Sequence, residues 1–205
     1  MIKGYVAESQ EEFMHQITHG FIPKEFFFYV GARIRDEPPG AMDDQILRDF
    51  EAAAARRGGA TLESELIYLR WQQWRMFAGT EKAVPVFAEA NAPAHDMRNK
   101  PFQCLGYEIK AVKPRDDKPY EAHVEITAEF LSIFEERWLN SALEWSVEQI
   151  AEDFSLVDYV TYPAVRVKVE RILNLINERR LAAGLPLVPR NALSQQKPAV
   201  SLKAH

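Results

Sequence analysis

The chain lacks the features that define several large protein classes. Its single cysteine, Cys104, excludes an intrachain disulfide and a zinc site built from several cysteines. The longest apolar run, residues 26–30 (FFFYV), is far shorter than the roughly 20 residues that span a bilayer. The first residues, MIKGYVAESQEEF, contain no signal-peptide-like apolar stretch, so we expect a cytoplasmic protein with no membrane partner. Glycine-rich loops of the dinucleotide or phosphate-binding kind are missing as well, which leaves nucleotide-cofactor chemistry without a basis.

The composition that is present is typical of a soluble globular domain. Of the 205 residues, 47 % are hydrophobic and 27 % are charged. At roughly 150 residues per domain, this length predicts a single domain. We place this domain at residues 1–188 and predict a flexible tail over residues 189–205. The net charge of −5 excludes a uniformly basic surface for nucleic acid, although it leaves room for a local basic patch.

Charge is unevenly distributed along the chain. From Pro163 onward there are eight Lys and Arg against two Glu, which gives +6, whereas residues 1–162 have 17 basic and 28 acidic residues. Eight of these acidic residues lie in 128–158, where Arg137 is the only basic residue. Two interpretations are open: the acidic and basic helices pair with each other, or the basic helix contacts nucleic-acid phosphates. The second predicts phosphate contacts from Arg166, Lys168, Arg171, Arg179 and Arg180.

Hydrophobic periodicity predicts a mixed α and β fold. Helical spacing marks four segments, of which the third is one long helix or two: residues 9–19, 46–54, 128–154 and 165–176. Strands are predicted over residues 26–30, 66–71, 74–78, 102–113 and 120–126. A loop as long as residues 79–101 is usually either functional or disordered. The fold class is therefore α+β: a mainly antiparallel sheet of about five strands, the order α-β-α-β-β-β-β-α-α, and C-terminal helices packed on one face.

Two tryptophans, Trp71 and Trp74, are flanked by Arg70 and Arg75. Aromatic and arginine side chains on strands form platforms on which single-stranded nucleic acids stack their bases. On a continuous strand Arg70 and Trp74 share a face, whereas a hairpin at residues 72–73 changes that assignment. Core packing with arginine stems along apolar surface explains the same residues without a ligand. We count Arg70, Trp74 and Arg75 among the predicted nucleic-acid contacts.

Three polar residues alternate along the last predicted strand: Glu121, His123 and Glu125. Alternate strand residues share a face and lie about 7 Å apart. Two carboxylates and an imidazole in a row are suitable ligands for Mg²⁺ or Mn²⁺. The alternative is a solvated face on which Lys110 of the neighbouring strand supplies a cross-strand ion pair.

Three features follow one another along the chain: the hydrophobic strand at 26–30, the segment Glu121-Ala122-His123, and the tyrosines Tyr159 and Tyr162. In this order they resemble the nicking domains that initiate rolling-circle replication, the His-hydrophobic-His endonucleases. The resemblance implies a tyrosine nucleophile that attacks a phosphodiester while a metal stabilises the phosphate. The chain departs from that pattern because Glu121 replaces the first histidine and both tyrosines precede Pro163. The alternative is that both tyrosines cap the core with their hydroxyls in water.

His15 and His19 are four residues apart on a predicted helix, which puts both imidazoles on one side. A zinc site needs a third and usually a fourth ligand, and the sequence does not indicate which residues would supply them. Two histidines in the last turn of a helix also suit the negative end of its dipole, which is the interpretation we favour.

Taken together, these patterns favour a non-catalytic accessory protein that binds DNA or RNA through the basic C-terminal helix and needs no cofactor. One alternative is a DNA-nicking enzyme that uses Mg²⁺ or Mn²⁺ at Glu121, His123 and Glu125 with Tyr159 or Tyr162 as nucleophile. The other is a protein–protein adaptor without affinity for nucleic acid.

Overall fold

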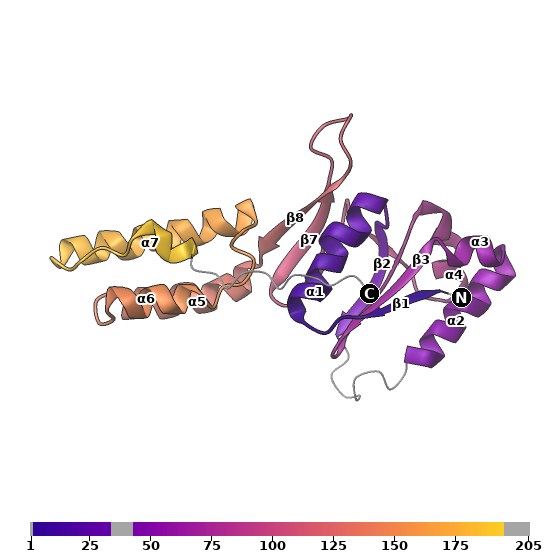
Figure 1. The fold of residues 1–205 in the computed structure, drawn as a ribbon, viewed down its shortest axis with the longest axis horizontal. Coiled ribbons are helices and arrows are strands. Elements are labelled where there is room, and N and C mark those ends of the chain that lie inside the picture. The colour runs from indigo at the N-terminus through magenta and orange to yellow at the C-terminus, as the bar shows by residue number, and fades with distance from the viewer. Residues whose placement is uncertain (1, 34–42, 195–205) are drawn as a thin grey trace. The chain divides into compact units, whose positions relative to one another are not determined.

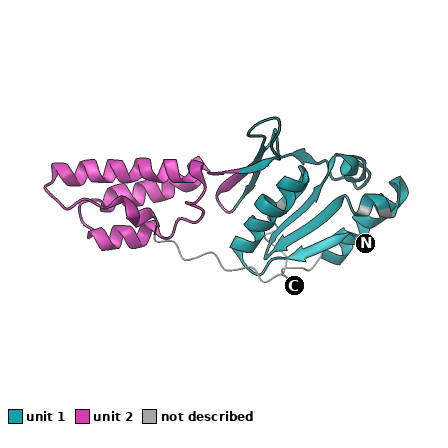
Figure 2. Ribbon diagram, turned by 45° about the horizontal axis from the view of Figure 1, so that its top comes forward, with its two compact units in different colours: residues 1–104, 109–122, 200–205 teal, residues 105–108, 123–199 magenta. Residues whose placement is uncertain are grey.

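A computed structural model describes residues 2–33 and 43–194 (Figure 1). Contacts within the chain divide the described residues into two compact units (Figure 2). Unit 1 contains the residues up to Cys104 together with Ile109–Ala122, and unit 2 contains Leu105–Glu108 and the residues from His123 onward. That residues 1–188 unfold as one domain stays a prediction.

Unit 1 is built on a mixed five-stranded sheet with the strand order β1-β3-β4-β2-β5. The edge strand β1 runs parallel to β3, and the other neighbouring strands are antiparallel. The predicted apolar strand at 26–30 becomes β2, which lies between β4 and β5. The strands are β1 (Lys3–Val6), β2 (Phe28–Arg33), β3 (Leu66–Trp71), β4 (Trp74–Gly79) and β5 (His95–Asp96).

A side-chain hydrogen bond at Ser9 marks the start of the first helix of unit 1. Ser9 accepts a hydrogen bond from the backbone N–H of Glu12, which satisfies one of the first helical amides and starts α1. The helix then widens into the π-helical segment η1 instead of ending at Gly20. The helices of unit 1 are α1 (Gln10–His15), η1 (Gln16–Phe21), η2 (Ile22–Lys24), α2 (Asp43–Arg57), α3 (Ala60–Glu63), η3 (Glu81–Ala83) and α4 (Val84–Glu89).

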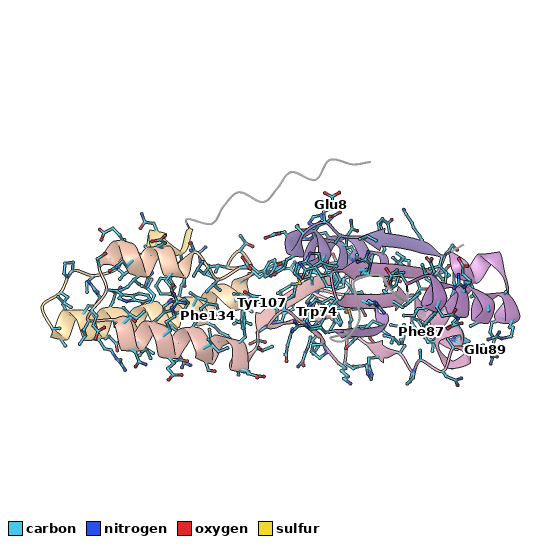
Figure 3. All side chains as sticks on the ribbon, turned by 90° about the horizontal axis from the view of Figure 1, so that it is seen from below. Glu8, Trp74, Phe87, Glu89, Tyr107 and Phe134 are labelled. Atoms are coloured by element: carbon cyan, nitrogen blue, oxygen red, sulfur yellow. The ribbon has the colours of Figure 1, made fainter. Side chains whose placement is uncertain are left out.

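Helices cover both faces of this sheet (Figure 1). On one face the ring of Phe13 from α1 packs against Trp71 of β3. On the other face Phe50 of α2 stacks on Phe77 of β4, and their ring centroids are 3.9 Å apart. Phe87 of α4 meets Phe50 edge-on and lies in the same core cluster (Figure 3). Successive side chains of a strand point to opposite faces, so β3 and β4 contribute apolar side chains to the packing on both faces.

A second, three-stranded antiparallel sheet has the order β6-β7-β8. Its strands are β6 (Phe102–Cys104), β7 (Tyr107–Val112) and β8 (Glu121–Ile126). The predicted single strand over 102–113 is therefore two strands, joined by a turn at Leu105 and Gly106 with φ of 57° and 83°. Two positive φ values define the tight hairpin turn that matches the twist of the strands. In β7 the buried residues alternate with half-buried ones, as the sequence pattern predicts.

Unit 2 is mainly helical. Its elements include α5 (Ala128–Ser141), α6 (Val147–Phe154), α7 (Pro163–Ala182) and the 3-10 turn η4 (Arg190–Ser194). The predicted segment 128–154 is two helices because Ser146 and Gln149 form a full capping box that starts α6. Trp138 and Phe154 are fully buried and their rings lie 4.2 Å apart, with Phe134 next to Trp138 (Figure 3).

The α+β class predicted from the sequence is confirmed, with the helical unit at the C-terminal end of the chain. The strands belong to two sheets, and β1 precedes the first helix. The segment predicted as a long loop, 79–101, contains η3, α4 and β5. At the predicted tail, residues 190–194 form η4 with Ala192 and Leu193 buried, and residues 195–205 lie outside the described residues.

Candidate functional site

Arg180, near the end of α7, points into unit 2. Only 3 % of the residue is exposed. Its Nη1 donates to the carbonyls of Ala142 and Trp145, both at 2.8 Å, and its Nε donates to the carbonyl of Pro186 at 2.6 Å. The first two carbonyls follow the end of α5, where backbone acceptors have no partner within the helix. The structure does not support the predicted phosphate contact at Arg180, because the guanidinium is buried and bonded to the protein's own backbone.

The other cations of α7 also have partners within unit 2. Lys168 pairs with Glu125 at 2.6 Å and donates to the carbonyl of Ile126 at 3.0 Å. The guanidinium of Arg171 is 3.7 Å from the carboxylate of Glu135 in α5, which is the helix-to-helix pairing weighed in the first interpretation. Arg166 pairs with Glu170 one turn on, and Arg179 donates to the carbonyl of Leu139.

The charge balance of unit 2 is negative in spite of its basic helix. Its described residues contain seven Lys and Arg against twelve Asp and Glu. Long-range attraction of a polyanion depends on clustered, unbalanced positive charge. Arg166, Arg171 and Arg179 remain exposed, but each lies beside a carboxylate or a backbone carbonyl. The charges on the surface of α7 therefore give little support to the hypothesis that this helix binds nucleic acid.

The predicted stacking platform at Arg70, Trp74 and Arg75 is divided by a hairpin. The strand register pairs Arg70 with Arg75 and Trp71 with Trp74. Directly opposed residues share a face of the sheet, so the two arginines lie on one face and the two tryptophans on the other. Arg75 is 5 % exposed. The three residues therefore do not form one exposed platform, because the turn at residues 72–73 reverses the chain.

The arginine pair has a structural role on the face covered by α2. Nε of Arg70 lies 2.5 Å from Oδ2 of Asp43, the first residue of α2, and Nε of Arg75 lies 3.3 Å from Oδ1. The hydroxyl of Tyr68 donates to the same carboxylate at 2.7 Å. Burial, followed by this hydrogen bond to Asp43, raises the pKa of Tyr68 well above its ordinary value. The carboxylate thus anchors the start of α2 to β3 and β4, at the helix end where negative charge is favourable.

The predicted metal ligands of β8 do not come together as a set. Glu121 and His123 are exposed, and Nε2 of His123 is 3.9 Å from Oε2 of Glu125. Glu125 is engaged by Lys168, whose hydrogen bond lowers the pKa of that carboxyl group. Across residues 2–33 and 43–194, no three His, Cys, Asp or Glu side chains are grouped so as to hold a metal ion. The three-ligand site at Glu121, His123 and Glu125 is therefore not formed in this structure.

The two candidate nucleophiles lie in the connection between α6 and α7. The ring of Tyr159 packs edge-on against Tyr107 at 4.9 Å and lies 6.3 Å from Tyr162. The hydroxyl of Tyr107 donates to the carbonyl of Asp158 at 2.8 Å, which fastens this connection to β7. Tyr162 is the residue before α7, so neither candidate lies inside a helix. These contacts fit the alternative in which the tyrosines cap the core.

A feature that the sequence did not reveal is an apolar end of unit 2, which we call the leucine tip: Leu143, Leu181 and Leu187. Their exposed fractions are 52 %, 69 % and 49 %. Each leucine directly follows a residue of the Arg180 network, namely Ala142, Arg180 itself and Pro186. The guanidinium therefore joins three positions of the backbone near the end of α7, and an exposed leucine directly follows each of them. Hydrophobic spacing along the chain does not indicate this arrangement, because Leu143 is far in the sequence from Leu181 and Leu187.

Two acidic residues follow Leu143 in the chain. Glu144 follows Leu143 and is exposed. Glu148 is exposed as well, and its pKa is lowered by hydrogen bonds from Ser146 and its own backbone, with a smaller contribution from Arg180. The positive charge of Arg180 itself is buried. Glu144 and Glu148 thus place negative charge next to Leu143, while the exposed Arg179 lies two residues before Leu181.

Comparison of the chain with protein-family models, curated proteins and solved structures finds no match. In the part of the chain that the structure describes, no helix combines the length and the apolar character that crossing a bilayer requires.

Proposed function

We propose that the protein is an adaptor that binds another protein chain through the leucine tip of unit 2. The observation that supports this function is that the exposed Leu143, Leu181 and Leu187 each directly follow a position joined by the buried Arg180 guanidinium. Scattered exposed leucines are ordinary on a protein surface, whereas apolar side chains grouped on a rigid support are typical of interaction sites. Three hydrogen bonds that the Arg180 guanidinium donates to backbone carbonyls supply that support.

The charge next to the leucine tip indicates the kind of partner. The described residues of unit 2 have five more acidic than basic side chains, and Glu144 and Glu148 lie next to the tip. Apolar side chains next to negative charge are complementary to an amphipathic segment that carries Lys or Arg beside its apolar residues. The proposed partner is therefore a basic amphipathic segment of another protein, not a nucleic acid.

The test uses a fluorescent peptide of leucine and lysine at helical spacing as the probe, with binding to the full chain followed by anisotropy. We expect the double variant L143S/L181S to bind the peptide about tenfold or more weakly, since two apolar contacts are lost. Val167 is 66 % exposed on α7 away from the Arg180 network, so Val167→Ser is the matched control and should bind like the unchanged chain.

Two outcomes overturn the proposal. In the first, L143S/L181S and Val167→Ser bind the peptide equally well, which shows that only net charge is sensed. In the second, a labelled single-stranded or duplex oligonucleotide binds more tightly than the peptide and dissociates steeply with added salt. That second result restores the nucleic-acid hypothesis, and Arg166→Gln, Arg171→Gln and Arg179→Gln then locate the contact.

A further inference from the structure

Two imidazoles lie together on the exposed side of the first helical segment. His15 is the last residue of α1 and His19 lies in the π-helical segment η1. Both residues are exposed, their ring centroids are 4.5 Å apart, and the ring planes differ by 14°. Side chains four residues apart meet on a helix surface, and π-helical turns occur often at functional sites. The pair is therefore accessible and held close by the backbone.

A buried hydroxyl group determines which nitrogen of His19 has the proton. Thr18 is 2 % exposed, and its hydroxyl donates to the carbonyl of Met14 at 2.8 Å. The same oxygen lies 2.8 Å from Nδ1 of His19. A hydroxyl has a single hydrogen and a carbonyl can only accept, so Nδ1 of His19 must be the donor. Nε2 of His19 consequently holds the lone pair and faces away from Thr18.

This arrangement matches that of metal-binding histidines in proteins. A metal-ligating imidazole usually donates its other N–H to a fixed oxygen, which sets the tautomer and the ring orientation. The terminal torsion of an exposed histidine is broad, so the ring of His15 is able to turn its lone pair toward that of His19.

We propose that His15 and His19 form a two-histidine site for a late first-row divalent metal ion such as Ni²⁺ or Cu²⁺, with water in the remaining positions. Imidazole nitrogens suit these ions, whereas Mg²⁺ and Ca²⁺ take oxygen ligands. Both side chains are exposed, so solvent is able to supply the remaining ligands. This site lies in unit 1 and is independent of the adaptor function proposed for unit 2.

The test is a calorimetric titration of the full, untagged chain with Ni²⁺ and with Cu²⁺, one variant at a time. We expect one ion per chain, and a loss of about tenfold or more in affinity with His15→Asn or His19→Asn. Thr18→Val keeps the shape of the side chain but removes the acceptor for Nδ1–H, and the loss of such a partner typically weakens binding about 10- to 100-fold. His95→Asn, which changes an exposed histidine elsewhere in unit 1, is the control and should bind like the unchanged chain.

A second readout distinguishes the site from a merely structural role of these residues. Imidazole nitrogen NMR of the unliganded chain should show His19 as the Nδ1–H tautomer, and Thr18→Val should weaken that preference. Metal addition should shift the Nε2 resonance of His19 and a ring nitrogen of His15 together. Unchanged affinity in both His15→Asn and His19→Asn, or metal shifts confined to other histidines, overturns the proposal.

Discussion

The indole N–H of Trp138 donates a hydrogen bond of 2.7 Å to Oδ2 of Asp153, and both residues are buried. Trp138 belongs to α5 and Asp153 to α6, so this contact joins the two helices. The guanidinium of Arg137 pairs with the other carboxylate oxygen from a position that is half exposed. The buried carboxylate of Asp153 is thus bonded to the neutral indole N–H of Trp138 and paired with the half-exposed guanidinium of Arg137.

Removal of the Asp153 carboxylate should destabilise unit 2. We expect Asp153→Leu to lower the free energy of unfolding by about 3 kcal/mol, because the Trp138 N–H is left buried without an acceptor and Arg137 loses its partner. Asp153→Asn keeps an acceptor oxygen and should cost about 1 kcal/mol. Urea denaturation measures both, with the exposed neighbour change Glu152→Leu as the control. Equal midpoints for Asp153→Leu and Glu152→Leu would contradict the role of the hydrogen bond.

Neighbouring arginines of α7 should differ sharply in their effect on stability. Arg180→Met leaves the carbonyls of Ala142, Trp145 and Pro186 without their donor, and we expect a loss of about 3 kcal/mol. Arg179→Met removes one hydrogen bond from an exposed side chain and should cost less than about 1 kcal/mol. Thermal melts and urea titrations of the two variants provide the comparison. Similar losses in both would show that burial of the Arg180 guanidinium does not matter.

Arg180 also shows that counting charges along a sequence does not reveal which charged side chains are buried. The residue lies four positions after Ile176, on the same helical stripe as the buried Val169, Ile172 and Leu173. Helical spacing therefore places Arg180 inside, while its charge led to the prediction that it lies outside. The start of the first helix was easier to predict, because the cap at Ser9 acts within three residues and needs no tertiary contact.

The hairpins were harder to predict because their turns lack the usual signals. Neither the turn that begins at Gln72 (φ 49°) nor the one at Leu105 and Gly106 contains Asn-Gly or Asp-Gly. The first turn decides on which face Trp74 lies, and thereby whether a stacking platform exists. Which residues share a face of the sheet depends on how two strands pair. The residue pattern along a single strand does not contain that information.

The ion pair between Lys168 and Glu125 should contribute a pH-dependent stability. The hydrogen bond from Lys168 lowers the pKa of the Glu125 carboxyl group in the folded chain. The unfolded state therefore binds the proton more tightly, so the contribution is present above the ordinary glutamate pKa and is lost as the pH falls through the lowered value. In Lys168→Met the Glu125 pKa should rise toward its ordinary value, which a carboxyl-carbon NMR titration measures. Arg166→Met, whose partner is Glu170, is the control and should leave the Glu125 pKa unchanged.

The turn between β6 and β7 should not tolerate a side chain at Gly106. A Cβ atom there would lie 2.3 Å from ring atoms of Phe130, and the φ of 83° disfavours any L-residue. We expect Gly106→Ala to lower the free energy of unfolding by about 2–4 kcal/mol, the sum of backbone strain and a clash in a packed cluster. Gly184 has a φ of 71°, and a Cβ atom at that position would meet no neighbouring side chain within 4 Å, so Gly184→Ala isolates the backbone cost at about 1 kcal/mol. Equal losses at the two glycines would show that Phe130 moves aside freely.

The thiol of Cys104 provides a test of whether the two units unfold together. Cys104 lies in unit 1, is 2 % exposed, and has its Sγ 3.7 Å from Sδ of Met14. Burial raises the pKa of this thiol far above its ordinary value, so a disulfide reagent should label it only after the chain opens. When opening and closing are faster than labelling, the labelling rate follows the free energy of opening.

Asp153 belongs to unit 2, so Asp153→Leu destabilises unit 2 directly and its effect on unit 1 can be measured at Cys104. If residues 1–188 unfold as one domain, a loss of about 3 kcal/mol in unit 2 should accelerate the labelling of Cys104 by about 100-fold. We expect this acceleration because β7 and β8 each contribute residues to both units, so neither unit keeps complete strands when the other unfolds. Glu152→Leu should leave the rate unchanged. Labelling of Asp153→Leu at the unaltered rate would show instead that unit 1 holds its structure while unit 2 opens, and the single-domain prediction would then be wrong.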